Sequence, residues 1–285
     1  MLLLISALTL IAVQLSHGFQ SPVHSRAFVR RQGMQMKAQV KGGSVVALVT
    51  PMTDSNAIDY GKLDELLKWH VSEGTDGIVV LGTTGESSMI SLEDRAKVIK
   101  ASVSAVNGAV PIIVGTGTIE AGKVIDLSKQ ALDLGADATL VITPYYVKPP
   151  QRALVTHFTA IADAVEIPMI LYNCPGRTGV DLKPETLSNL ATHRNIIGIK
   201  DATGDLSRVE SIRSICGRDF LLYSGEDDNG CEFVRRGGDG VISVTANVAP
   251  NKMHRYFEFP VIFFVNHHVE CYLLQRKVGW TRPMP

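Results

Sequence analysis

The sequence has no excess of charge of either sign. Lysine and arginine together number 28, aspartate and glutamate also number 28, and the formal net charge is zero. A balanced chain gives no reason to expect nucleic acid or stable membrane insertion, since both rely on basic or long apolar stretches. With 45% hydrophobic and 6% aromatic residues, the composition is that of an ordinary globular protein. A small-molecule substrate fits this chain better.

Clustered cysteines are also missing. The four cysteines form no C-x-x-C pair, and no histidine stands near them at metal-ligand spacing; they are Cys174, Cys216, Cys231 and Cys271. Cysteines spread over a chain long enough to build its own core favour reduced thiols in a reducing compartment. We therefore expect no structural metal site and no disulfide scaffold.

No acidic residue precedes Asp54, and this sets the beginning of the chain apart. Leu2 to Val13 is an apolar run too short to span a bilayer, which is typical of a signal peptide. The following stretch, Gln20 to Lys41, carries five lysines and arginines and no acid. Residues 1–41 therefore resemble the bipartite leader of plastids that proteins reach through the secretory route. We expect delivery to the plastid stroma, and a plain secretory signal is the alternative.

Short apolar runs rich in valine and isoleucine recur after Ser44, at roughly the interval of repeated strand-helix units. They are continuous rather than alternating, which predicts strands buried on both faces, as in a parallel sheet covered by helices. The expected strands are Val45–Thr50, Gly77–Leu81, Pro111–Val114, Thr139–Thr143, Met169–Tyr172, Ile196–Lys200, Phe220–Tyr223 and Val241–Val244.

Helix-period segments lie between these runs, at Tyr60–Ser72, Lys183–Ala191 and Leu206–Ile215. The chain lacks the glycine fingerprint of a dinucleotide-binding sheet. We therefore predict an α/β fold, a (β/α)8 TIM barrel, over residues 42–253. An open, doubly wound sheet is the alternative.

Polar residues gather where the expected strands end, which is where TIM barrels hold their chemistry. Lys200 follows the apolar stretch Ile196–Ile199, so its ammonium would stand at the mouth of an apolar barrel. Burial lowers the pKa of a lysine and leaves a nucleophilic amine for carbonyl substrates. A lone lysine in this place would more simply face solvent, and the neighbouring motifs are what favour a catalytic lysine.

Three further residue groups accompany Lys200. Thr83 and Thr84, between two glycines at an expected helix start, offer hydroxyl and backbone N–H groups to a carboxylate, although a capped helix would explain them equally well. Tyr172 can move protons if its phenol reaches the lysine, or it is a core tyrosine. Arg177 can hold a substrate carboxylate, or it pairs with a loop acid.

An acidic run follows the seventh expected strand, at Glu226, Asp227 and Asp228. Clustered acids can bind a metal ion, but no partner acids or histidines gather on the other strands. We interpret this run as a charge cluster at a helix N-terminus.

Four linked motifs carry a family resemblance. They are G-T-T-G-E at Gly82–Glu86, T-P-Y-Y at Thr143–Tyr146, Y-N-C-P-G-R-T-G at Tyr172–Gly179 and I-I-G-I-K-D-A-T-G at Ile196–Gly204. Together with G-V-I-S-V-T-A-N at Gly240–Asn247, they resemble the 4-hydroxy-tetrahydrodipicolinate (dihydrodipicolinate) synthase family. The resemblance covers roughly Gly43 to Met253.

The resemblance implies a function and residue roles. The family is a group of Schiff-base-forming lyases that condense pyruvate with aspartate 4-semialdehyde in lysine biosynthesis by the diaminopimelate route, without a cofactor or metal. It implies that Lys200 forms the Schiff base and that Tyr172 transfers protons. It further implies that Thr83 links Tyr172 to Tyr146, whose side chain crosses a dimer interface. The implied substrate-binding residues are Thr84 for the pyruvate carboxylate, Arg177 for the semialdehyde carboxylate, and backbone carbonyls near Gly225 and Ile242. A homodimer or homotetramer is expected.

Related aldolases leave a rival function open. N-acetylneuraminate lyases and 2-keto-3-deoxy-sugar-acid aldolases share the lysine, the tyrosine and a similar G-x-T-G-E loop. They usually lack an arginine at the position of Arg177, because their second substrate is a polyhydroxylated sugar. Arg177 therefore favours the synthase.

The resemblance ends at Met253. The family continues with a helix that closes the barrel and then a C-terminal helical domain, and His254–Pro285 is expected to form neither. Residues 254–285 are thus an atypical tail, and an inactive, truncated product is a further alternative.

Lysine-inhibited members of the family bind lysine through an asparagine and a glutamate after the strand-three G-T-G. In this chain, the corresponding positions hold Ile119 and Lys123. A cationic side chain would repel the effector's ammonium, so weak or absent inhibition by lysine is expected.

Overall fold

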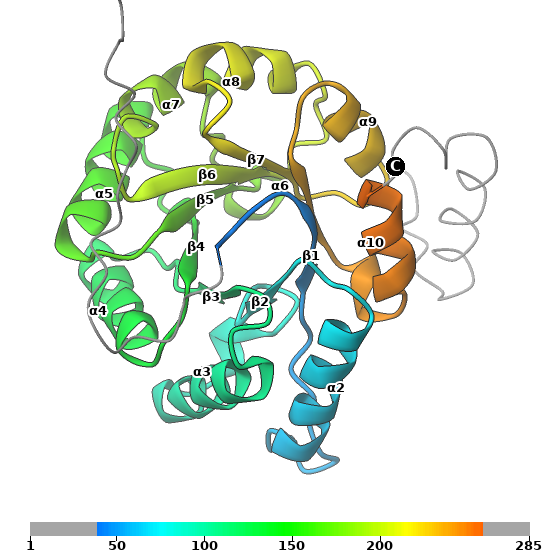
Figure 1. Cartoon of the computed structure of the whole chain (residues 1–285). Coiled ribbons are helices and arrows are strands. Elements are labelled where there is room, and N and C mark those ends of the chain that lie inside the picture. The colour runs from blue at the N-terminus through cyan, green and yellow to red at the C-terminus, as the bar shows by residue number, and fades with distance from the viewer. Residues whose placement is uncertain (1–38, 259–285) are drawn as a thin grey trace, which may run out of the picture. The chain divides into compact units, whose positions relative to one another are not determined.

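The computed structural model describes residues 39–258, which form a closed barrel of parallel strands surrounded by helices (Figure 1). The strands pair in chain order, and β1 closes the ring by pairing with β8. The eight strands are β1 (Gly43–Ala47), β2 (Gly77–Val80), β3 (Ile112–Gly115), β4 (Ala138–Ile142), β5 (Met169–Asn173), β6 (Ile196–Asp201), β7 (Leu221–Ser224) and β8 (Gly240–Ser243). The predicted TIM barrel is confirmed, and each strand lies within a few residues of its expected place.

Helices surround the barrel, and the short α6 (Pro175–Thr178) lies over its carboxyl mouth instead (Figure 1). The helices are α2 (Tyr60–Ser72), α3 (Leu92–Val106), α4 (Ala121–Asp133), α5 (Gln151–Ala164), α6, α7 (Pro184–Leu190), α8 (Arg208–Cys216), α9 (Gly230–Arg235) and α10 (Pro250–Glu258), with 3-10 turns η1 (Ser87–Met89) and η2 (Thr245–Asn247). The expected Tyr60–Ser72 helix has the predicted bounds, because Asp59 caps it by accepting a hydrogen bond from the Lys62 N–H. None of the described helices is long and apolar enough to cross a membrane.

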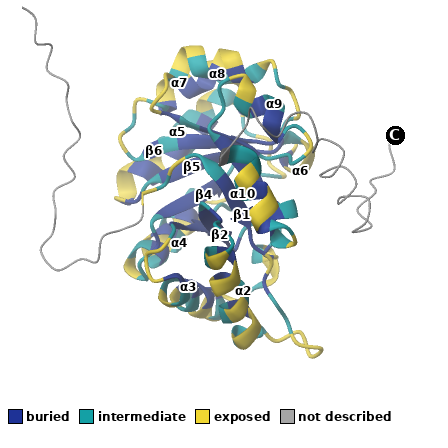
Figure 2. Ribbon diagram, turned by 45° about the vertical axis from the view of Figure 1, so that its right-hand side comes forward, coloured by how far each residue is buried: buried dark blue, intermediate teal, exposed yellow. Residues whose placement is uncertain are grey.

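The apolar core has two layers, visible as the dark blue strands and inner helix faces of Figure 2. The outer layer lies between strands and helices. The inner layer fills the barrel with alternate strand residues, among them Val45, Ile113, Leu140, Ile170 and Tyr223. The barrel is therefore a packed core, and only its ends are open to function.

One expectation about the end of the barrel is wrong. We expected no closing helix after strand eight, yet α10 runs from Pro250 to Glu258. Proline is tolerated at the first helical position, since its missing N–H has no helical partner there. Met253 is buried against the outer core, which also contacts Phe257, and the Nδ1 of His254 lies 3.1 Å from the Asp76 carboxylate. The barrel therefore extends beyond the expected boundary at residue 253.

The remaining calls on the two ends of the chain lie outside the described residues. These are the leader at residues 1–41, apart from its last positions, the absence of a C-terminal helical domain, and the tail beyond residue 258. They stay predictions.

Candidate active site

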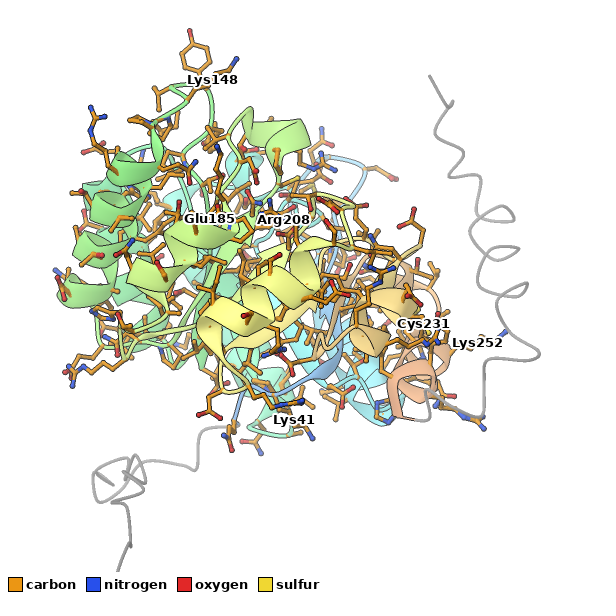
Figure 3. The ribbon with its side chains drawn as sticks, turned by 90° about the horizontal axis from the view of Figure 1, so that it is seen from above. Lys41, Lys148, Glu185, Arg208, Cys231 and Lys252 are labelled. Atoms are coloured by element: carbon orange, nitrogen blue, oxygen red, sulfur yellow. The ribbon has the colours of Figure 1, made fainter. Side chains whose placement is uncertain are left out.

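Lys200 stands inside the carboxyl end of the barrel. It belongs to β6 and pairs in register with Tyr172 on β5 and with Tyr223 on β7. Its side chain is 6% exposed. The expected position of the lysine, at the end of an apolar strand and buried in the barrel mouth, is thus what the structure shows, and the solvent-facing alternative is excluded. Figure 3 shows the barrel from the side, with Lys148 at this carboxyl end and Lys41 at the opposite end.

Burial controls the chemistry of the Lys200 amine. The pKa of Lys200 is lowered to about 8, mainly because burial removes the amine from water, and the charge of Arg177 acts in the same direction. Three groups act in the opposite direction and favour the ammonium form: Asp227 most strongly, then Cys174 and Glu226. A substantial fraction of neutral amine is therefore present near neutral pH, as a nucleophile requires.

Tyr172 lies directly beside the lysine. The Nζ of Lys200 is 4.6 Å from the centroid of the Tyr172 ring. Burial raises the pKa of the Tyr172 phenol, and a hydrogen bond with the Cys174 thiol raises it further. The phenol therefore keeps its proton and can donate it to a reacting group.

Tyr223, a second tyrosine of the barrel, has a structural role. Tyr223 is fully buried, and its hydroxyl donates to the backbone carbonyl of Lys41 at the amino end. Tyr172 instead meets a thiol, which is a weak hydrogen-bond partner, at the reactive end. The contrast favours a functional role for Tyr172 over that of a core tyrosine.

Gly225 and Ala202 shape the wall around the lysine. The N–H of Gly225 donates to the carbonyl of Asp201 over 2.7 Å. A Cβ at position 225 would lie 2.5 Å from the Ala202 Cβ and 3.1 Å from the Lys200 Cε. Only glycine allows this approach, so the end of β7 can lie against the lysine stem. Ile242 on β8 is fully buried in the inner core.

The G-T-T-G-E loop follows β2 as a tight turn. The N–H of Glu86 donates to the Thr83 carbonyl, and the turn leads into the short 3-10 turn η1. Helix α3 begins only at Leu92 and is capped by Ser91, so the threonines do not stand at an α-helix start as expected. Thr84 is half-buried and Thr83 is exposed.

Tyr146 does not reach the site of its own chain. Its side chain is 84% exposed, and its φ of 69° is a left-handed conformation that tyrosine rarely adopts. The structure therefore brings together Lys200, Tyr172 and Gly225, whereas Thr83 and Tyr146 stand exposed at the rim. The link between these two stays a prediction.

Arg177 lies in α6, directly after the strand that carries Tyr172. It is exposed, and its charge acts on both Tyr172 and Lys200. No ion pair between described residues involves Arg177, which disfavours the alternative of a structural pair with a loop acid. Its guanidinium is thus available to an anion at the mouth.

Two residues of the site were missed by the sequence analysis. Cys174 follows Tyr172 by two positions, so both side chains face the barrel interior, and this strand alternation was the signal. Asp227 was interpreted as part of a helix N-terminal cluster, but α9 begins at Gly230 with Asn229 as its cap. The Asp227 carboxylate instead binds the end of β8, through the N–H groups of Val244 and Thr245.

The described residues offer no candidate metal centre. No group of three or more histidine, cysteine, aspartate or glutamate side chains among residues 39–258 is arranged to hold an ion. The site that the residues do form is a buried amine with a phenol beside it and cationic and polar groups at its rim. Such a site can form an imine with a keto acid.

Comparison with known proteins agrees with this geometry. A family model described as the Dihydrodipicolinate synthetase family matches residues 40–259. The 4-hydroxy-tetrahydrodipicolinate synthase of Alcanivorax borkumensis is 52% identical over 211 residues, which are 74% of this chain and 72% of that protein.

Two solved structures extend the comparison. The chloride-inhibited dihydrodipicolinate synthase of Acinetobacter baumannii, complexed with pyruvate, is 44% identical with a TM-score of 0.77, and the match covers 84% of this chain and 81% of that one. The synthase of Cyanidioschyzon merolae with lysine bound is 34% identical with a TM-score of 0.76, covering 83% and 80%. Because the family model spans the whole described barrel and the site has the expected lysine and tyrosine, the chain belongs to the dihydrodipicolinate synthetase family.

Proposed function

We propose that this protein condenses pyruvate with L-aspartate 4-semialdehyde to give 4-hydroxy-tetrahydrodipicolinate, in lysine biosynthesis by the diaminopimelate pathway. The observation that carries the proposal is the buried Lys200, with a pKa lowered to about 8, beside the Tyr172 phenol. The relative complexed with pyruvate supports the first substrate. The reaction needs no cofactor, since the lysine itself provides the electron sink.

The first half of the reaction builds an imine. The neutral amine of Lys200 attacks the keto carbon of pyruvate, and one proton from nitrogen and one from the Tyr172 side leave with the carbonyl oxygen as water. The cationic imine withdraws electrons from the methyl group, which loses a proton to the Tyr172 phenolate to give an enamine. Thr84 binds the pyruvate carboxylate, and the backbone at Gly225 and Ile242 lines the pocket.

The second half forms a carbon–carbon bond. The enamine carbon attacks the aldehyde of the semialdehyde, whose oxygen takes a proton from Tyr172. The amino group that came from the semialdehyde then attacks the imine carbon. This attack closes the ring and expels Lys200 as the free amine. Arg177 holds the semialdehyde carboxylate, because its planar guanidinium at the mouth matches a carboxylate. The second substrate of the related aldolases is a polyhydroxylated sugar that has no such carboxylate, which favours the synthase.

Proton supply to Tyr172 passes through Thr83 and through Tyr146 of a neighbouring copy. The support is the 84% exposure of Tyr146 on a rim that also exposes Val147, Met89 and Leu92. Burial of such apolar side chains drives association, so the working form is a homodimer or homotetramer.

The working compartment is the plastid stroma. The support is the apolar run followed by a basic, acid-free stretch in residues 1–41, most of which lie outside the described residues. A fusion of residues 1–41 to a fluorescent protein tests this localisation when it is expressed in a cell whose plastids are reached through the secretory route. Secretion of the fusion would overturn the localisation without affecting the catalytic proposal.

Borohydride trapping tests the catalytic proposal. Pyruvate plus borohydride should attach irreversibly to Lys200, because reduction converts the imine to a stable secondary amine. Peptide mass mapping locates the adduct, and Lys200→Arg is the matched control that keeps a cation but cannot form an imine. No adduct in folded protein would reject the Schiff base and favour an inactive product, whereas an equal adduct in the control would reject Lys200 as its site.

A further inference from the structure

Asp227 stands where the loop after β7 meets the end of β8. One carboxylate oxygen, Oδ2, accepts hydrogen bonds from the Val244 N–H over 3.0 Å, the Thr245 N–H over 2.8 Å and the Thr245 hydroxyl over 2.9 Å. These contacts fix the loop that also carries Gly225, whose backbone lies against the Lys200 stem. Asp227 is thereby held rigidly at the mouth of the barrel.

The other oxygen of Asp227 is used differently. Oδ1 is buried and has no hydrogen-bond partner among the described residues. An ionised carboxylate oxygen without a partner is costly in a protein interior unless a positive charge lies nearby. The nearby positive charge is that of Lys200: Gly225, two residues before Asp227, lies against the lysine stem, and the charge of Asp227 favours the ammonium form of the lysine.

We propose that Asp227 is a positioning residue for the Schiff base: Oδ2 ties the loop to β8, and Oδ1 stabilises the positive charge at the Lys200 nitrogen. The inference rests on the proposed function and deepens it. The imine that carries the reaction is cationic, and a fixed carboxylate stabilises it without reorganisation, as preorganised charges do in active sites.

The other charged or titratable groups around Lys200 do not replace Asp227. Glu226, from the same loop, acts more weakly on the lysine, as does the Cys174 thiol from β5. Arg177 from α6 opposes the positive charge. The Tyr172 phenol keeps its proton, because burial raises its pKa.

The pH dependence of pyruvate affinity separates this electrostatic role from a structural one. Below the pKa of Lys200 the ammonium and the imine carry the same charge, so the carboxylate stabilises both and affinity is level. Above it, imine formation takes up a proton, and affinity falls about tenfold per pH unit. The affinity of the wild type for pyruvate should therefore be level up to about pH 8 and fall at higher pH. This break in the profile marks the pKa of Lys200.

Asp227→Asn is the test variant, because an amide keeps an acceptor for the β8 N–H groups and removes only the charge. We expect the break of this variant to lie about one pH unit lower, because loss of one neighbouring negative charge lowers the pKa of Lys200 by about that much. Its affinity for pyruvate should then equal that of the wild type at pH 6 and be about tenfold weaker at pH 9. Calorimetric titration from pH 6 to pH 9, with cyanoborohydride trapping at Lys200, measures both.

Controls make each outcome decisive. Asp228→Asn removes the same charge one residue away and should keep the wild-type break, and all variants retain Cys174. An unshifted break, or an equal loss of affinity at every pH, would overturn the role of Asp227 and leave the Schiff base intact. If Asp227→Asn does not fold, the neutral Asp227→Ser gives the same readout. No pyruvate adduct in the wild type would instead reject the proposed function itself.

Discussion

The two ends of the barrel use aspartate in different ways. At the amino end, an aspartate directly before a strand binds the backbone of the neighbouring strand, and this arrangement occurs three times. The Oδ2 atoms of Asp76, Asp137 and Asp239 accept hydrogen bonds from the N–H groups of Ser44, Ile112 and Leu222, respectively. Asp76 also contacts the imidazole of His254, and Asp239 contacts the guanidinium of Arg213. These aspartates stabilise the strand ends.

At the carboxyl end, Asp227 has the same kind of backbone contacts, but its Oδ1 is buried without a hydrogen-bond partner among the described residues. Backbone strain is also concentrated here, since Leu81, Glu86, Tyr146 and Lys148 have positive φ angles in the loops after β2 and β4. Non-glycine residues in such conformations reduce stability and persist mainly at functional sites. The comparison teaches that the amino end is built for stability and the carboxyl end for chemistry.

Lys200→Met should have the largest effect on the chemistry at the carboxyl end. Removing the amine abolishes imine formation, so turnover should fall by at least about a thousandfold. An apolar side chain of similar length avoids burying a charge, so we expect the free energy of unfolding to rise by roughly 1 kcal/mol. Steady-state kinetics and denaturant unfolding measure the two effects. Lower stability with residual turnover would contradict the division of roles.

Arg177→Ala should have a smaller effect within the carboxyl end. Losing the guanidinium should lower kcat/KM for the semialdehyde by about 10- to 100-fold, because a charge-assisted contact is lost. Pyruvate trapping at Lys200 should remain largely intact. Arg152→Ala, which removes an exposed arginine from α5, is the control. Equal loss of trapping and semialdehyde use would remove the argument for this substrate.

Asp239→Ala sharpens the comparison from the amino end. It leaves the Leu222 N–H and the half-buried Arg213 without the carboxylate that both contact. We expect the free energy of unfolding to fall by about 2–4 kcal/mol, while kcat/KM of the folded enzyme stays unchanged. Asp219→Ala, at a nearby exposed aspartate, should leave stability nearly unaltered. A selective loss of activity in Asp239→Ala would mean that the amino end contributes to the chemistry.

The smallest expected effect concerns free lysine at the carboxyl rim. The relative from Cyanidioschyzon merolae was solved with lysine bound, but here the side chains at the two expected effector positions are the apolar Ile119 and the cationic Lys123. Titration with lysine should change the initial rate little. Tight, saturable inhibition would show that other residues bind the effector. If the wild type is not inhibited, Lys123→Glu should make inhibition by lysine appear.

Much of the fold was predictable from the sequence because its signals are local. Short apolar runs, most of them rich in valine and isoleucine, marked the strands, and the helix period marked Tyr60–Ser72. The closing helix was not predicted because the family resemblance ends at Met253, although the four-residue spacing of Met253 and Phe257 puts both on the core side. Among the site residues, Lys200 and Tyr172 were recognisable because each ends an apolar strand.

The sequence by itself determined the eight strands, their order and the residues at their carboxyl ends, since burial on both faces demands continuous apolar runs. Only the tertiary structure decided that Asp227 binds the backbone at the end of β8, and that Tyr146 stands exposed. These relations join segments far apart in the chain. They depend on strand register and loop conformation, which closure of the barrel fixes and local residue preferences do not.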